Sequence, residues 1–253
     1  MSSSGGKIVG YSLVGFFGGI ILFVHGLSAF RLKRLIENTP TSKVRSAAVG
    51  LVEVFGVAVP CEGKLSSPFS KKDCVYYKYS IEEYRHSGKS SRWVTLKSGE
   101  CRSQFYVEDD TGKILVNPNE ARIEIPIDSE YNSGNGNDPP ECVLEFLSHN
   151  GIAHEGFFGW NKRMRFREYF IEPGDSIYVM GIADISQDSA GSANGSENLM
   201  IHKGANNKTF YISDQPEKKI LSELGGKILW GVFGGAVLSV GCLAIIMMYF
   251  GWI

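Results

Sequence analysis

The side chains with the greatest capacity for chemistry are scattered along this chain of 253 residues. No histidines have the HExxH spacing of a metalloprotease, no two cysteines form a CxxC, and P-loop, GxSxG and strand–GxGxxG–helix motifs are absent. Zinc sites depend on such spacings. We therefore expect no catalytic residue, no metal and no cofactor, and we expect reduced, structural thiols. The residues concerned are Cys61, Cys74, Cys101, Cys142, Cys242, His86, His149, His154 and His202.

Carboxylates beside glycine or proline are expected to shape turns. Asp109 and Gly112 belong to the sequence DDTG between two β-rich segments, which predicts a hairpin turn with Gly112 at a positive φ. Pro173, Gly174 and Asp175 belong to the sequence EPGD, which predicts a second tight turn. Asp favours such positions because its short side chain bonds nearby backbone amides. We therefore expect structural roles for these five residues.

One run, FFGWNKRMRFR at residues 157–167, mixes aromatic and basic side chains. Its candidate binding residues are Trp160, Lys162, Arg163 and Arg165. Such side chains can lie on anionic lipid headgroups, and they can also bind an acidic partner. The same alternation is what a strand with one buried and one solvated face requires. The sequence leaves these three interpretations open.

Two apolar segments near the ends organise the chain. The first, Ile8 to Phe30, has 23 residues without Asp, Glu, Lys or Arg and as a helix measures roughly 34 Å, enough to cross a bilayer. The second runs from Ile228 to Ile253. The first is longer than the apolar core of a cleaved signal peptide, and Arg31 and Lys33 follow it closely. We therefore expect a retained anchor.

Basic residues flank both spans on the side of the middle region. Only Lys7 precedes the first span, and no basic residue follows the second. The positive-inside rule then predicts a two-pass integral membrane protein with a cytoplasmic central domain and both termini on the far side. The basic residues on the domain side are Arg31, Lys33, Arg34, Lys43, Arg45, Lys218, Lys219 and Lys227.

Both spans carry glycines four residues apart. Gly15 and Gly19 lie in the first span, and Gly231 and Gly235 lie in the second, within the similar strings GFFGGI and GVFGGA. Small residues at this spacing share one helix face and allow close approach of two backbones. The pattern predicts that the spans pack together, within one chain or between chains, although glycine is also simply frequent in membrane helices.

The segment between the spans has the pattern of a mainly β domain. About ten short strands with turn signals and one helix predict a barrel- or sandwich-like α+β fold. We further expect a helix that begins at Glu141 and ends before Gly151, a polar loop at residues 131–140, a flexible loop at residues 184–198, and a final hairpin of residues 199–203 and 209–213.

The domain organisation follows from these segments. A net charge of −1 gives no electrostatic basis for binding nucleic acid. The predicted parts are a short non-cytoplasmic tail at 1–7, a first transmembrane helix at 8–30, a juxtamembrane helix and linker at 31–44, the β domain at 45–219, a connecting helix at 220–227 and a second transmembrane helix at 228–253.

Three stretches, in this order, carry a family resemblance: SPFSKKDCVYYKYSIEEYR (67–85), DDTGKILVNPNEARI (109–123) and REYFIEPGDSIYVMGIA (167–183). They resemble the GIDE family, whose middle region is also called the "beside a membrane" domain. The order of span, domain and span matches as well. The best-known members are membrane ubiquitin ligases of mitochondria and plastids, so the resemblance implies a link to protein ubiquitination.

One departure from that family affects the expected activity. In the ligases, a zinc-binding RING after the second span recruits the ubiquitin-conjugating enzyme. This sequence ends at Ile253, and its scattered cysteines and histidines lack the regular RING spacing. We therefore expect a RING-less member, similar to shorter prokaryotic ones, to which no transferase residue of the family can be assigned.

Three functions remain open. The first, which we expect, is a membrane-tethered protein-binding or scaffolding module that contacts membrane lipid, binds a cytosolic or membrane protein and can form homo-oligomers. The second is a ubiquitin-ligase-like component that acts with a separate catalytic chain. The third is a membrane-perturbing effector in which the glycine faces assemble helices into a pore.

Overall fold

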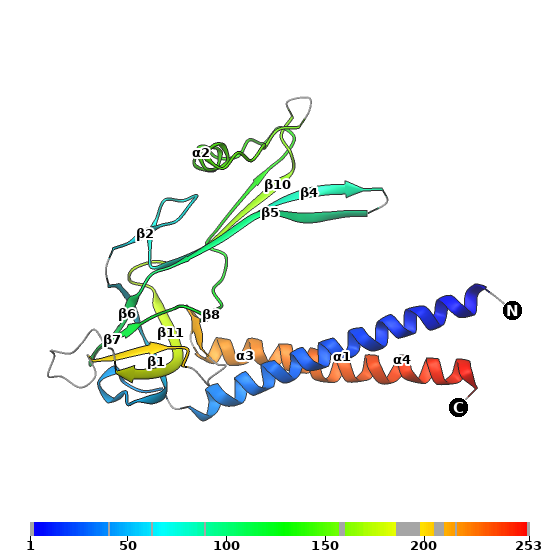
Figure 1. The fold of residues 1–253 in the computed structure, drawn as a ribbon, viewed down its shortest axis with the longest axis horizontal. Helices are drawn as coiled ribbons and strands as arrows, with labels where there is room; N and C mark the ends of the chain where they lie inside the picture. The colour runs from blue at the N-terminus through cyan, green and yellow to red at the C-terminus, as the bar shows by residue number, and fades with distance from the viewer. Residues whose placement is uncertain are drawn as a thin grey trace. The chain divides into compact units, whose positions relative to one another are not determined.

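The computed structural model describes residues 3–39, 41–61, 63–88, 90–156, 160–185, 198–204, 210–215 and 217–251. The chain divides into two compact units (Figure 1). A helical unit combines Met1–Pro40 with Pro216–Ile253, and a β unit comprises Thr41–Gln215. The structure thus confirms a mainly β domain with a long apolar helix on either side of it in the sequence.

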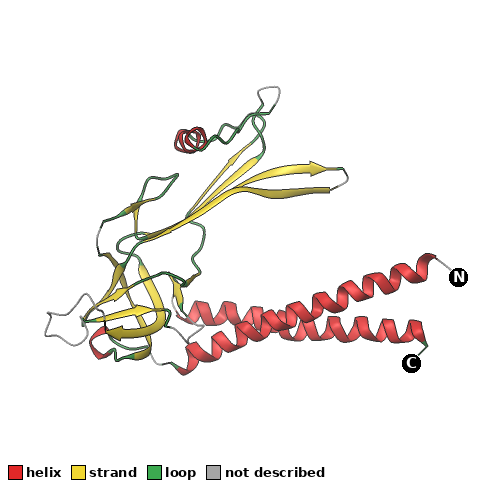
Figure 2. Cartoon of the chain, in the orientation of Figure 1, coloured by secondary structure: helices red, strands yellow, loops and turns green. Residues whose placement is uncertain are grey.

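The elements of the helical unit, drawn in red in Figure 2, are α1 (Ser3–Asn38), α3 (Glu217–Ile228), the π-helical η3 (Leu229–Gly234) and α4 (Gly235–Phe250). α1 packs against α3, η3 and α4. The two helical segments are antiparallel, because Gly15 lies beside Cys242 and Gly26 lies beside Gly231. Residues 3–7, predicted as a short tail before the first span, are part of α1. Adding residues to an existing helix is far easier than starting one.

Both helical segments are long and apolar enough to cross a membrane, from Gly6 to Asn38 and from Lys219 to Phe250. Only 11% of the most apolar stretch of each is buried within the molecule. A core helix of a soluble protein would bury most of such a stretch. Instead, large side chains such as Trp230 are exposed, and exposed apolar faces of this extent are typical of membrane or partner contacts.

Five strands of the β unit close into a barrel. They are β1 (Gly50–Pro60), β6 (Phe105–Asp109), β7 (Gly112–Val116), β11 (Ser176–Ile185) and β12 (Leu199–His202). The order around the barrel is β1-β6-β7-β12-β11, and β11 pairs again with β1. All pairings are antiparallel except that of β7 with β12. Numbered along the chain, this is the 1-2-3-5-4 order of an OB-fold barrel.

The barrel closes because β1 is long enough to pair with two strands. Its first part pairs with β11 and its last residues pair with β6. Val52, Val54 and Ala58 alternate along it and are buried in the barrel core. A Cβ atom on Gly56 would lie 2.3 Å from the carbonyl oxygen of Glu108, so glycine is needed where the two strands approach each other.

A second sheet has four antiparallel strands in the order β5-β4-β10-β9. They are β5 (Ser90–Arg102), β4 (Tyr76–Ser87), β10 (Met164–Ile171) and β9 (Ser129–Ser133). Helix α2 (Glu141–His149) covers one face, where Val143 and Leu147 pack with Phe69, Ile81 and Phe166. The remaining elements are η1 (Val44–Ser46), β2 (Leu65–Ser66), β3 (Asp73–Cys74), β8 (Arg122–Ile123) and β13 (Tyr211–Ser213).

The predicted polar loop of the β unit is wrong in part, and its predicted final hairpin is wrong. Tyr131 to Ser133, expected in a polar loop, lie in β9, whose polar residues fit a strand at the edge of a sheet. The predicted final hairpin does not form, because β12 and β13 pair with successive parts of β11 and not with each other. Of the predicted loop at 184–198, Asp184 and Ile185 end β11, and residues 186–197 lie outside the described part of the chain.

Candidate functional site

The first predicted turn is built around the carboxylate of Asp109. It accepts hydrogen bonds from the N–H groups of Val44 (3.0 Å), Thr111 (2.7 Å) and Gly112 (3.1 Å). Burial by itself would raise the pKa of Asp109, but the hydrogen bonds from Thr111, Val44 and Gly112 together lower it. Gly112 does not have the predicted positive φ. The side chain of Asp109 supplies the hydrogen bonds of the turn, so no left-handed residue is required.

The second predicted turn lies against the barrel. Gly174 has a φ of +100°, and the carboxylate of Asp175 accepts the N–H of Glu172 at 2.8 Å. The N–H of Gly174 donates to the carbonyl oxygen of Ala58 on β1 at 2.9 Å. Pro173 lies between Glu172 and Gly174 in this turn. The turn therefore connects β10 to β11 and contacts β1.

Glu168 on β10 has a structural role that the sequence analysis did not identify. Its side chain is completely buried. It accepts the N–H of Phe69 at 2.7 Å, and the N–H and hydroxyl of Ser70 at 3.1 and 2.6 Å. A buried carboxylate is costly without such donors. Glu168 therefore fixes the connection between β2 and β3 to the four-stranded sheet.

The aromatic and basic run lies partly on the face of this sheet opposite α2. The guanidinium of Arg165 pairs with Glu82 at 2.7 Å and lies 4.4 Å from the ring centroid of Trp93. The guanidinium of Arg163 lies 4.6 Å from the ring centroid of Tyr84. These contacts engage both arginines within the unit. They fix both side chains on the face of the sheet opposite α2.

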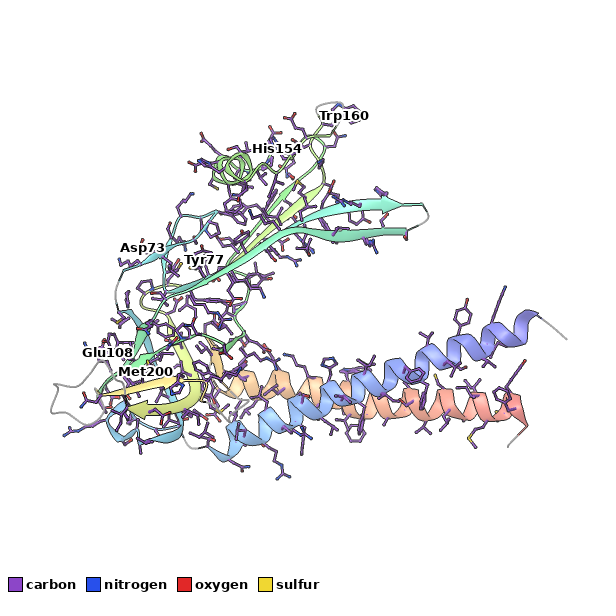
Figure 3. The ribbon with its side chains drawn as sticks, viewed as in Figure 1. Asp73, Tyr77, Glu108, His154, Trp160 and Met200 are labelled. Atoms are coloured by element: carbon purple, nitrogen blue, oxygen red, sulfur yellow. The ribbon has the colours of Figure 1, made fainter. Side chains whose placement is uncertain are left out.

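The other two candidate residues lie just before β10. Trp160 is 68% exposed, and Figure 3 shows it near His154. Lys162 donates its Nζ–H to the carbonyl oxygen of Ala153 at 3.1 Å, and its backbone N–H bonds to the carbonyl oxygen of His154 at 2.8 Å. Residues 157–159, the first part of the run, lie outside the described residues. Among the aromatic residues of the run that the structure describes, Trp160 is exposed and Phe166 is buried.

The structure places all four predicted packing glycines against the opposite helical segment of the same chain. A Cβ on Gly19 would lie 2.8 Å from the carbonyl oxygen of Gly235, and one on Gly231 would lie 2.6 Å from the Cα of Gly26. Such distances leave no room for a side chain without a shift of the backbone. Gly26 belongs to no GxxxG pair and was missed. The contacts are Gly15 with Cys242, Gly19 with Gly235, and Gly231 with Gly26.

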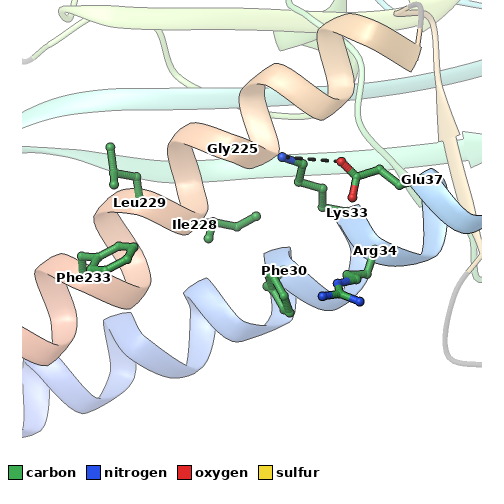
Figure 4. A pocket seen from close by; sticks show the side chains of 8 residues that line it. All are labelled: Phe30, Lys33, Arg34, Glu37, Gly225, Ile228, Leu229 and Phe233. Atoms are coloured by element: carbon green, nitrogen blue, oxygen red, sulfur yellow. Dashed lines mark ion pairs between the residues drawn. The ribbon is translucent and has the colours of Figure 1, made fainter.

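A cavity of about 230 Å³ opens between α1 and the α3–η3 segment (Figure 4). Its walls combine apolar side chains with two cations and one carboxylate. Lys33 and Glu37 form an ion pair of 3.7 Å one helical turn apart. The Arg34 guanidinium lies 5.4 Å from the ring centroid of Phe30. The lining residues are Phe30, Lys33, Arg34, Glu37, Gly225, Ile228, Leu229 and Phe233.

A comparison with models of protein families shows the family to which this chain belongs. The model of the GIDE family, described as E3 ubiquitin ligase, matches residues 76–246, about two thirds of the chain. The chain belongs to the GIDE family. The resemblance read from the sequence is thereby confirmed. No curated protein and no solved structure matches the chain.

The GIDE match begins with β4 and ends at Ile246 within α4. It therefore includes Asp109, Glu168 and the α3–η3 wall of the cavity. Helix α1, which carries Lys33 and Arg34, lies outside the matched range. From the sequence, Lys33 and Arg34 contributed only to the prediction of membrane orientation. Their position on a cavity wall becomes visible only when the packing of the helices is known.

Proposed function

We propose that this GIDE protein is a membrane-tethered binding or scaffolding module. In this proposal the two helical segments cross the bilayer as an antiparallel pair, and the β unit lies in the cytoplasm and binds a protein partner. The observation that carries the proposal is the helix pairing within one chain, through backbone contacts at Gly19, Gly26, Gly231 and Gly235. Lipid has no hydrophobic effect to drive such pairing, so close approach at small residues is how membrane helices associate.

Anchoring at both ends would keep a bound partner at the membrane. Only residues 39–43 separate α1 from η1, and only residues 214–216 separate β13 from α3. A module held in this way raises the effective concentration of its partner near other membrane proteins without any further contact. The excess of basic residues on the domain side of both spans supports a cytoplasmic β unit.

We further propose the face formed by Tyr84, Trp93, Arg163 and Arg165, together with the exposed Trp160, as the partner surface. Tyr, Trp and Arg are the residue types most enriched among the dominant contacts of protein interfaces. Cation–π contacts of Arg163 with Tyr84 and of Arg165 with Trp93 hold these four side chains in place before a partner arrives. Little conformational entropy would then be lost on binding.

Site-specific photo-crosslinking in intact membranes tests this proposal. A photoreactive amino acid at Trp160 should give one discrete protein adduct, whereas the same amino acid at the exposed Lys64 should not. The adduct should weaken when Arg163→Glu is added. Alkaline carbonate should leave the chain in the membrane fraction, and a reporter after Ile253 should lie outside the cytoplasm. A cytoplasmic reporter, or equal adducts from both positions, would contradict the proposal.

A ubiquitin-ligase-like component is the second candidate, and the description of the matched family favours it. In that case the partner would be a separate catalytic chain or its substrate. Reconstituted ubiquitin transfer by such a chain should then accelerate when the full-length protein shares its vesicles. The glycine faces that suggested a membrane-perturbing assembly pack within one chain, so the structure offers that third function no support.

A further inference from the structure

We propose that the cavity between α1 and the α3–η3 segment binds an anionic phospholipid. In this arrangement Lys33 and Arg34 hold the lipid phosphate, and Phe30, Leu229 and Phe233 contact the beginning of its acyl chains. The inference rests on the proposed membrane anchoring, because it requires the helices to lie in a bilayer. It concerns a site in the helical unit that is separate from the proposed partner surface.

The position of the cavity along the helices suits a lipid headgroup. Phe30 ends the first apolar segment, and Lys33 and Arg34 follow within one turn of α1. On the opposite wall, Gly225 precedes the second apolar segment, which begins with Ile228. The lining thus changes from apolar to charged within the cavity. The same change occurs across the boundary between hydrocarbon and headgroups.

The charges of the cavity favour an anion. Two cations and one carboxylate line it, and the Lys33–Glu37 pair is loose and half exposed. Among the residues that the structure describes, Arg34 has a ring contact with Phe30 and no hydrogen bond or ion pair to a protein oxygen. By contrast, Arg165 and Arg167 of the β unit both pair with glutamates. Arg34 therefore keeps its donors available for a phosphate.

The size of the cavity suits one end of a lipid. About 230 Å³ is smaller than the 300–1,000 Å³ typical of pockets for whole drug-sized ligands. A glycerophosphate group can occupy such a volume while its acyl chains leave along exposed apolar side chains. Leu229 and Phe233 are 58% and 64% exposed and provide that path. A soluble phosphate would leave these two side chains without a contact.

Glycine at position 225 keeps the cavity open. A Cβ on Gly225 would meet only the Nζ atom of Lys33, at 4.0 Å. A larger side chain there fits without a backbone clash, but it projects into the space beside the ammonium group. Gly225→Leu therefore fills the cavity without changing the charge, and leucine is a better helix former than glycine. This variant separates a cavity from a diffuse basic surface.

The experiment uses the full-length chain in phosphatidylcholine vesicles that contain trace spin-labelled phosphatidylglycerol or spin-labelled phosphatidylcholine. The motionally restricted fraction of each label gives their relative association constant. We expect a preference for phosphatidylglycerol. It should fall about fivefold for each cation removed in Lys33→Gln and Arg34→Gln. It should be lost in Gly225→Leu, and it should change less than twofold in Lys219→Gln, which removes an exposed charge outside the cavity.

Three results would overturn the inference. The first is no lipid preference in the wild-type chain. The second is a preference that survives Gly225→Leu, because the attraction would then be a diffuse effect of charge. The third is release of the labelled lipid by millimolar glycerol phosphate, which would indicate a site for a soluble phosphate. Extraction of the chain by alkaline carbonate would instead contradict the membrane anchoring, so the two proposals fail by different measurements.

Discussion

Replacing Glu168 by glutamine should destabilise the β unit, although the change removes no volume. In the structure one carboxylate oxygen accepts the Phe69 N–H, and the other accepts both the N–H and the hydroxyl of Ser70. A glutamine amide has one acceptor oxygen and one NH₂ group, which only donates. At least one backbone N–H of this completely buried site would then face another donor.

The size of the effect follows from the hydrogen bonds lost. A hydrogen bond to a charged group contributes about 1.5–3 kcal/mol, and a buried donor left without an acceptor costs about 1–3 kcal/mol. Removing the buried charge recovers part of this, because an amide is cheaper to desolvate than a carboxylate. We expect a net loss of about 3 kcal/mol. In a domain of 150–250 residues this corresponds to a decrease in Tm of about 6–12 °C.

Thermal unfolding of the full-length chain in detergent, followed by near-UV circular dichroism, measures this decrease. Hydrogen exchange of residues 66–72 locates it, because the Phe69 and Ser70 amides should lose protection first. Glu130→Gln is the matched control. Glu130 pairs with Arg167 at 2.8 Å but is partly exposed, so its loss should cost less than about 1 kcal/mol. Equal Tm changes in both variants, or unchanged exchange at 66–72, would refute the reasoning.

Two further outcomes follow from single contacts. Gly15→Cys should form an intrachain disulfide with Cys242 on mild oxidation, because the new Cβ would lie 2.6 Å from the Cys242 Sγ. The control Gly18→Cys should form none, because a Cβ there has nothing within 4 Å. Disulfide-linked dimers of Gly15→Cys on non-reducing gels would contradict pairing of the helices within one chain. The free energy of unfolding should fall above about pH 9. Burial raises the pKa of the Cys74 thiol to about 12 and also raises the pKa of Tyr211, so the unfolded chain releases protons that the folded chain retains. Denaturant titrations at pH 8 and pH 11 measure this loss, and equal values would contradict it.

Local pattern was enough to predict many of the elements. Alternating apolar and charged residues in the run at 157–167 indicated a possible strand, and β10 begins within that run at Met164. The helix expected from Glu141 is observed as α2. The closure of the barrel could not be predicted. It depends on pairing between β1 and β11, more than a hundred residues apart in the chain. The polar composition of β9 concealed a strand, because an edge strand has less need of apolar residues.

The same distinction applies to the sites. Gly15 and Gly231 were visible because each begins a GxxxG motif, whereas Gly26 packs just as closely without such a motif. Glu168 was hidden because its partners, Phe69 and Ser70, precede it by 99 and 98 residues. No local rule marks a buried glutamate within a strand. Its context of aromatic neighbours, in the sequence REYF, is the one signal that could have suggested burial.

The topology explains why one buried carboxylate matters for the proposed function. The first insertion into the barrel, between β1 and β6, contributes β4 and β5, and the second, between β7 and β11, contributes β9, α2 and β10. The two insertions build the four-stranded sheet only by pairing β4 with β10. The proposed partner surface is divided in the same way, with Tyr84 and Trp93 from the first and Arg163 and Arg165 from the second. Glu168 bonds one insertion to the other, so a surface assembled from both depends on it, even though no partner would touch it.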